Sequence, residues 1–535
     1  MDLEITLKKD TKHIIRGEIV MRKNLLKSLE IFFILFLVLT GCSSNSNNKA
    51  GGSSTGGATA LEITYASTAD VAGLSPIDTN DQASSNVIGQ VYETLFTLNP
   101  KTMEPEPFLA ESYKNPDPNT WVIKLKKGIK FHDGTDFNAE AVKYTFEQIK
   151  DPNRAAPRAS LLAPIDSIEV QDEYTIVIKT KEPYGPMLAA LAHTNASIVS
   201  PTADKEGDIN KSPVGTGPFK FVEWVPGDHI TLTRNDDYWR DPAKLKTVTF
   251  KVVPEASTAI SMLQTGDVQF IDAIQSDLVS RVKSLKNVNL KISEGTRVSY
   301  LGFNMEKAPF NELAFRQAVA YGIDQEAYVK QLNGLGEYNE SIIGPKIFGY
   351  DEKAKDAGYP YDPEKAKQIV KEHGYSGTTI TILVGNTGNY MKMAEIVQSQ
   401  LSEIGLKVKI ESMEWGSFLD AARAGNFEMT FLGWANSTGD GSELLYPNLH
   451  SDNIGSSNNV RYNNPEFDKL VDESRSTVDQ EVRKQKLNEA NIMVIKEAPM
   501  IVMEHGMVSI AYDKTVSGLT VDPTGLWNLY NVSRK

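Results

Sequence analysis

The stretch from residue 378 to 434 alternates strand and helix patterns, and it restricts the fold more than any other part of the chain. Residues 379–384 are apolar and β-branched, as in a buried strand, and residues 390–404 place apolar side chains on one face of a helix that Gly405 ends. A strand, a short helix and a third strand are predicted next, at 406–410, 418–423 and 427–432. This βαβαβ order predicts parallel strands with right-handed crossovers, and therefore an α/β fold.

Three loops of this pattern meet at one edge of the predicted sheet. They span residues 385–389, 412–416 and 433–440. They carry polar side chains and two tryptophans, Trp415 and Trp434. Because open α/β sheets bind ligands at the carboxyl ends of their strands, the sequence predicts a small-molecule cleft there.

Composition and charge narrow the classes of function. The chain has 535 residues, of which 40% are hydrophobic and 23% charged, as is ordinary for a globular protein. A leader and tether of about 60 residues would leave roughly 475, enough for about three domains. The formal net charge of −13 argues against nucleic acid as a partner. The single cysteine, Cys42, excludes an internal disulfide.

The pattern of the N-terminal segment predicts a secretory signal. From Met21, the predicted true start, a basic stretch precedes the uncharged residues 31–40, which are too few to span a bilayer. Leu39-Thr-Gly-Cys42 resembles the bacterial lipobox, in which the cysteine is lipidated. We therefore expect a signal peptide over residues 1–42, with Cys42 as the lipid anchor. Residues 43–60, rich in Ser, Gly and Asn, then form a flexible tether.

A set of short motifs occurs in a fixed order through residues 61–535. They lie at 110–113, 121–135, 139–146, 214–219, 234–239, 315–318, 323–324, 433–434 and 464–468. They include Trp-Val-Ile-Lys-Leu-Lys-Lys-Gly-Ile-Lys-Phe-His-Asp-Gly-Thr and Val-Gly-Thr-Gly-Pro-Phe. Together they resemble the signature of the family 5 extracellular solute-binding proteins, which are the peptide, nickel and glutathione receptors of ABC importers.

The resemblance implies an α/β, two-lobed periplasmic-binding-protein-like fold of type II, cluster C, with an extra subdomain inserted in lobe I. Lobe I would comprise residues 61–98, 199–297 and 505–535, the inserted subdomain 99–198, and lobe II 298–504. The lobes would close over a ligand and present it to a permease and its ATPase subunits. No enzyme activity and no cofactor are expected. The protein would be a monomer, held by its lipid on the outer face of a Gram-positive-type cell membrane.

One position departs from the family pattern. Many peptide-binding members carry an aspartate three residues after the tryptophan of the Gly-Trp motif, and it pairs with the ligand's α-ammonium. Here the residue is Ser437, and the nearest acid is Asp440, three residues on, which would substitute for that aspartate if the loop curls. The run from Asn436 to Asp440 resembles members that bind glutathione. An aspartate introduced at 437 is expected to restore the amine partner of a plain peptide.

The predicted ligand is a short peptide, with glutathione as one candidate. The predicted ligand contacts are Thr79, Asn80, Thr216, Asn386, Trp415, Trp434, Asn436, Ser437 and Asp440. A receptor for a nickel-type metal chelate or an oligosaccharide is the alternative. A lipid-anchored peptidase is the remaining hypothesis, which the lack of an H-E-x-x-H motif disfavours; a G-x-S-x-G match at 52–56 falls in the tether.

Overall fold

A computed structural model of the protein describes residues 61–386 and 390–535. The predicted signal peptide, the tether and Cys42 lie outside the described residues. So do residues 387–389 at the tip of one predicted cleft loop.

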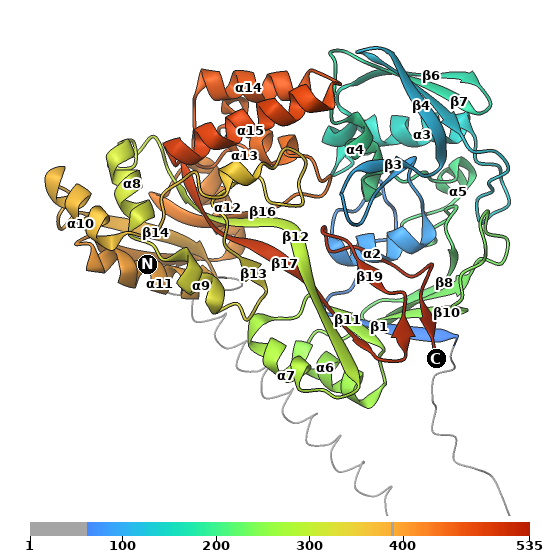
Figure 1. Ribbon diagram of the computed structural model, residues 1–535. Coiled ribbons are helices and arrows are strands. Elements are labelled where there is room, and N and C mark those ends of the chain that lie inside the picture. Colours follow the sequence, from blue (N-terminus) through green and yellow to red (C-terminus); the bar gives the residue numbers. More distant parts are fainter. Residues whose placement is uncertain (1–60, 387–389) are drawn as a thin grey trace, which may run out of the picture. The chain divides into compact units, whose positions relative to one another are not determined.

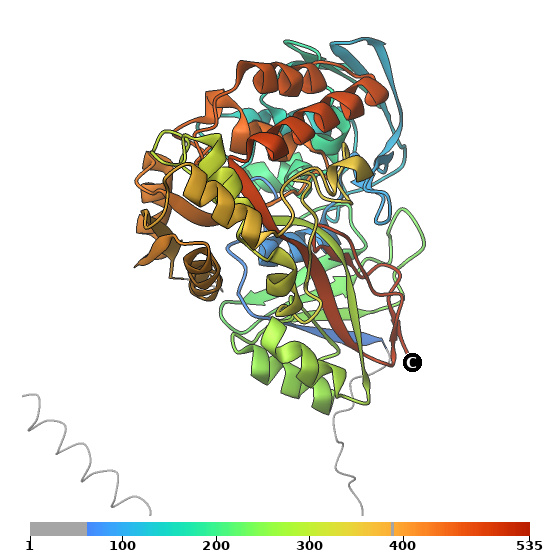
Figure 2. The same cartoon turned by 60° about the vertical axis from the view of Figure 1, so that its left-hand side comes forward.

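Two long antiparallel strands, β12 (Val288–Phe303) and β17 (Met500–Asp513), form the centre of the largest sheet. The sheet has eleven strands in the order β15-β14-β16-β12-β17-β11-β1-β10-β9-β8, and β13 (Gly336–Glu337) pairs with β17 beside this path. Figure 1 and Figure 2 both show the two long strands running through the middle of the described chain. The ladder between them shifts register between Glu294 and Val298 and again between Ser299 and Tyr300.

On one side of the long strands lies the predicted βαβαβ unit. It consists of β14 (Thr379–Gly385), α11 (Tyr390–Glu403), β15 (Lys407–Met413), α12 (Trp415–Ala424) and β16 (Met429–Ala435). Strand β14 pairs in parallel with both β15 and β16, which confirms the predicted parallel pairing. Helix α11 buries Met393, Val397 and Leu401 against the sheet, and Gly425 ends α12 in the left-handed conformation that favours glycine.

On the other side the sheet continues with shorter strands. They are β11 (Phe270–Asp272), β1 (Glu62–Ser67), β10 (Thr247–Val252), β9 (His229–Arg234) and β8 (Phe219–Val225). Strand β1 pairs in parallel with both β10 and β11. Strand β12 pairs with β16 of the first group and β17 pairs with β11 of the second, so one sheet runs through both lobes. The predicted lobe boundaries at 297/298 and 504/505 fall inside β12 and β17. The exact boundaries stay a prediction.

A separate four-stranded antiparallel sheet occupies the predicted inserted subdomain. Its order is β4 (Ala110–Asp117), β5 (Thr120–Leu125), β7 (Thr175–Thr180) and β6 (Ile165–Asp172), and α3 (Ala139–Lys150) packs against β6 and β7. Asn138 caps α3 by accepting a hydrogen bond from the Ala141 N–H. The architecture is therefore α/β and two-lobed, with an insertion, as the sequence predicted.

The other elements cover these sheets or connect them. The helices are α2 (Gln82–Val91), α4 (Met187–Ala192), α5 (Pro201–Glu206), α6 (Ala256–Thr265), α7 (Val279–Lys283), α8 (Leu313–Tyr321), α9 (Gln325–Lys330), α10 (Pro363–Glu372), α13 (Ser442–Leu449), α14 (Pro465–Arg475) and α15 (Gln480–Glu497). The short strands are β2 (Phe96–Leu98), β3 (Pro105–Pro107), β18 (Val516–Ser517), β19 (Thr520–Val521), β20 (Trp527–Asn528) and β21 (Ser533–Arg534). Within the described residues, no helix has both the length and the apolar content needed to cross a bilayer.

Candidate functional site

A cavity of about 620 Å³ opens between segments that are far apart in the sequence. Its lining comes from several segments: the start of α2, β2 and β3, Arg158, the 192–197 segment, Tyr238 and Arg240, residues 435–437 at the end of β16, and the C-terminal segment 518–531. Three of the predicted contacts, Asn80, Asn436 and Ser437, lie on this lining. A cavity of this size is typical of small-molecule sites.

Arg158 is the residue of this site that the sequence analysis missed. It follows α3 and precedes the 3₁₀ turn Ala159–Leu162. Its Nε donates to Oδ1 of Asn80 at 2.9 Å, and its Nη2 donates to Oγ of Ser437 at 2.9 Å. The guanidinium therefore joins the predicted inserted subdomain to the loop after β16. No motif marks Arg158, and its contact to Ser437 spans 279 positions of the chain, so sequence pattern carries no signal for it.

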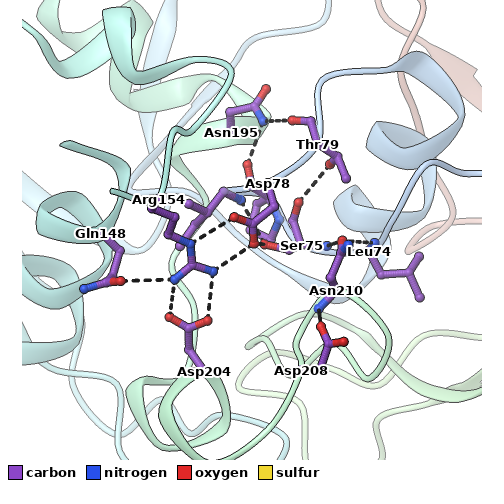
Figure 3. A network of polar contacts seen from close by, with 12 residues as sticks. Leu74, Ser75, Asp78, Thr79, Gln148, Arg154, Asn195, Asp204, Asp208 and Asn210 are labelled. Carbon is purple, nitrogen blue, oxygen red and sulfur yellow. Dashed lines mark hydrogen bonds and ion pairs between the residues drawn. The ribbon is translucent and has the colours of Figure 1, made fainter. Parts of the chain in front are cut away.

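A network of ion pairs around Arg154 joins the segment before Asn80 to the segment before Arg158 (Figure 3). Arg154 donates from Nε and Nη2 to the two carboxylate oxygens of Asp78, at 2.9 and 2.8 Å, and from Nη1 to Asp204 at 2.6 Å. Burial alone would raise the pKa of Asp78, but the hydrogen bonds from Arg154 and Ser75 outweigh it, and the pKa is lowered. The network fixes the 78–80 segment relative to the segment that carries Arg158.

Thr79 belongs to this support and not to the cavity lining. Its side chain is buried, with 5% exposed, and its Oγ1 donates to the Ser75 carbonyl oxygen at 2.8 Å. Asn195 donates from its side-chain amide to the carbonyl oxygens of Pro76 and Thr79, and Asn210 accepts from the Leu74 and Ser75 N–H groups (Figure 3). Thr79 therefore shapes the turn that presents Asn80.

Asp440, the acid nearest to Ser437 in sequence, already has partners for both of its carboxylate oxygens. Oδ2 accepts from Nη2 of Arg483 at 2.6 Å, and Oδ1 accepts from the N–H and hydroxyl of Ser442 at 2.9 and 2.7 Å. The Arg483 and Asp440 side chains are 2% and 4% exposed. Both carboxylate oxygens of Asp440 are therefore already bound within the protein. Asp440 also does not lie on the cavity lining.

Ser437 and Asn436 are held by partners within the same loop region. The carboxylate of Glu443, in the first turn of α13, accepts from the N–H and hydroxyl groups of Ser437 and of Thr438, at 2.7–3.0 Å. The Ser437 hydroxyl thus donates to Glu443 while it accepts from Arg158. Asn436 donates from Nδ2 to the Asp440 carbonyl at 2.7 Å and accepts from the Gly439 N–H at 2.7 Å.

The structure does not bring the other predicted contacts to this cavity. Trp415 stacks on Phe418 and Tyr390, with ring centroids 5.3 and 5.9 Å away. Trp434 is half-buried, and its indole N–H is buried without a hydrogen-bond partner among the described residues. Asn386 is exposed beside residues 387–389. For these residues a ligand contact stays a prediction.

Thr216 does not line the cavity, but it donates a hydrogen bond to Glu93, which does. The Thr216 hydroxyl is fully buried and donates to Oε2 of Glu93 at 2.7 Å, and Trp239 Nε1 donates to the same oxygen at 2.8 Å. Tyr238 donates to Oε1. Burial raises the pKa of Glu93 to about 7, although these three hydrogen bonds oppose the rise. Arg240 covers the same wall, 4.5 Å from the centre of the Tyr530 ring.

Three comparisons with known proteins place the chain among transport receptors. A family model described as "Bacterial extracellular solute-binding proteins, family 5 Middle" matches residues 104–456, which is more than half of the chain. Heme-binding protein A of Haemophilus influenzae is 30% identical, over 93% of this chain and 97% of its own length. The glutathione-binding protein GsiB of Escherichia coli K12 is 31% identical, over 85% of this chain and 89% of its own.

A solved structure gives the same answer for the fold. The periplasmic binding protein DppA from Helicobacter pylori, in complex with the peptide STSA, superposes with a TM-score of 0.74 at 30% identity. The match covers 88% of this chain and 98% of that one.

Proposed function

We propose that this chain, which belongs to the family 5 bacterial extracellular solute-binding proteins, captures short peptides, with glutathione among the candidates. The chain is a substrate-binding protein of an ABC importer, and members of the family are transport receptors and not enzymes. The finer assignment to peptides is supported by the relatives described as binding glutathione and the peptide STSA.

The observation that carries the proposal is the composition of the cavity wall. Its 620 Å³ are lined by residues of the predicted lobe I, its inserted subdomain and the loop after β16 of the predicted lobe II. A ligand in it touches parts of the chain that β12, β17, the hydrogen bond from the Gly185 N–H to the Arg475 carbonyl oxygen and the Arg158–Ser437 contact join. Such a ligand binds best when these parts are together, so it favours the closed arrangement.

The test is a calorimetric titration of the purified protein, paired with small-angle scattering. Trialanine and glutathione are the peptide probes, and a nickel–histidine complex, maltotriose and heme are the competing probes. We expect a peptide to bind most tightly and to reduce the radius of gyration. Tighter binding of a competing probe would contradict the peptide assignment, and binding without compaction would contradict hinge closure.

Among the described residues that line the cavity, the one histidine that a metal chelate would meet is His193. Its Nδ1 accepts a hydrogen bond from the Asn195 N–H at 3.1 Å, and burial lowers the pKa of His193 to about 3. Its Nδ1 is therefore already used within the protein, and this supports peptide over chelate as the ligand.

The proposal includes a lipid anchor at Cys42, carried by the lipobox-like sequence before it. Two acyl chains on one residue bind a membrane stably, because each buried CH₂ contributes about 0.8 kcal/mol. We expect Cys42→Ser to move the protein from the membrane fraction to the soluble fraction while ligand affinity is unchanged. A Cys42→Ser protein that stays with the membranes would refute the lipid anchor.

A further inference from the structure

We infer that the position at which peptide-binding relatives hold an ammonium group has reversed polarity here, and that Arg158 binds a carboxylate of the ligand. The inference rests on the proposed peptide function and names the part of the peptide that the cavity recognises at Ser437.

Arg158 has N–H groups that form no hydrogen bond with the described residues. Its partners, Asn80 and Ser437, are neutral, and they use only one N–H of Nε and one of Nη2. Nη1 donates to no residue in the described parts of the chain. The side chain is 24% exposed and lies on the cavity lining, so its unused N–H groups remain accessible to a ligand. A guanidinium presents parallel donors that match the two oxygens of a carboxylate.

Among the described residues, no carboxylate accepts a hydrogen bond from Arg158. Glu443 is the carboxylate within ion-pair distance, with Oε1 at 3.9 Å from Nη2 of Arg158. Its two oxygens already accept four hydrogen bonds from Ser437 and Thr438. Two other arginines nearby are different, since Arg154 and Arg483 each donate to a carboxylate at 2.6 Å. Arg158 therefore keeps an anion-binding capacity that Arg154 and Arg483 have used.

An ammonium group at Ser437 would lie close to the positive charge of Arg158. The Ser437 hydroxyl accepts from Arg158, so an ammonium at Ser437 would lie beside a guanidinium at hydrogen-bond distance. Like charges at such a distance repel. Asp440, which the sequence suggested as a replacement anchor, is paired with Arg483. The Glu443 carboxylate lies beside the Ser437 hydroxyl, but four protein donors already bind it, whereas Arg158 keeps unused donors that favour an anionic group.

The same contact couples recognition to closure. Arg158 bonds Asn80 on one side and Ser437 on the other, so a carboxylate on its free edge would hold all three groups together. A ligand that satisfies Arg158 in this bridging position stabilises the arrangement in which the bridge exists.

Calorimetric titration with three matched peptides tests the inference on the full chain. Trialanine has both end charges, trialanine amide lacks the carboxylate, and N-acetyl-trialanine lacks the ammonium. We expect the amide to bind about ten- to a hundred-fold more weakly than trialanine, as for loss of a hydrogen bond to a charged group. N-acetylation is expected to change the affinity less than amidation does.

Variants then assign the discrimination to Arg158. In Arg158→Gln the acid and the amide should bind about equally, and in Arg158→Lys, which keeps the charge without the fork, part of the preference should return. The matched control is Arg281→Gln. Arg281 also donates from Nη2 to a serine hydroxyl, at 2.8 Å, but it lies away from the cavity lining and should leave the preference intact.

The outcomes are distinct. If acid and amide bind wild type equally, or if Arg158→Gln keeps the preference while its melting temperature matches wild type, the inference is wrong and the peptide function stands. If acetylation is the change that abolishes binding, the site holds an ammonium and the inference is wrong. If none of the three peptides binds, the proposed peptide function fails and the inference fails with it.

Discussion

Two arginines meet the same short segment after β16 in different ways. Arg483 is 2% exposed and donates to the Asp440 carboxylate at 2.6 Å, whereas Arg158 is 24% exposed and donates to the Ser437 hydroxyl at 2.9 Å. In the first pair both charges are buried and matched. In the second the positive charge faces a cavity and a neutral partner. The first contact has a structural role, and the second leaves a cation available to a ligand.

The strongest test of this comparison removes one half of the buried pair. Arg483→Met leaves the Asp440 carboxylate buried without its cation, and removing one partner of such a pair costs about 3–5 kcal/mol. We expect a loss of that order in the free energy of unfolding, measured with urea. The control is the double variant Arg483→Met/Asp440→Leu, which removes both charges.

The double variant should be more stable than Arg483→Met, because it leaves no unpaired buried charge. A single variant with near wild-type stability would show that the pair has little structural role, and the contrast with Arg158 would fail.

Glu93 sharpens the comparison, since it is a buried acid with only neutral hydrogen-bond donors. Its pKa is raised from 4.5 to about 7, so the folded protein binds more protons than the unfolded chain between these values. The contribution of Glu93 to stability is therefore greatest below about pH 4.5 and falls as the pH rises to about 7, by on the order of 3 kcal/mol.

Glu93→Gln should remove this pH dependence. The urea-measured stability of wild type minus that of the variant is expected to become more negative from pH 5 to pH 7.5. A difference that stays constant over this range would show that Glu93 keeps its ordinary pKa, and that neutral donors compensate its burial fully.

The smallest expected effect comes from giving Arg158 a carboxylate at hydrogen-bond distance, closer than Glu443 at 3.9 Å. Ser437→Asp places a carboxylate beside the guanidinium, and we expect it to compete with the ligand's carboxylate and weaken trialanine binding about tenfold. Ser437→Asn, which adds no charge, is the control. The sequence alone predicted the opposite, a gain in affinity for a plain peptide, so a tighter complex with Ser437→Asp would restore the ammonium anchor.

The difference between these two expectations shows where sequence reasoning ends. The βαβαβ unit and its parallel pairing could be predicted because the periodicity of 379–432 is local. The neutral Ser437 and the nearby Asp440 were also visible in the sequence. Their partners were not, since Arg483 lies 43 positions from Asp440 and Arg158 lies 279 positions from Ser437. Only the folded chain shows which acid is used and which cation is free.

The most direct measurement of the central claim is mass spectrometry of the solute that co-purifies with the protein. The protein is isolated under native conditions, and the bound molecule is identified after denaturation. The account predicts a short peptide with a free carboxylate, present with wild type and depleted with Arg158→Gln but not with Arg281→Gln. Recovery of a metal chelate, an oligosaccharide, heme or a peptide without a free carboxylate would contradict it.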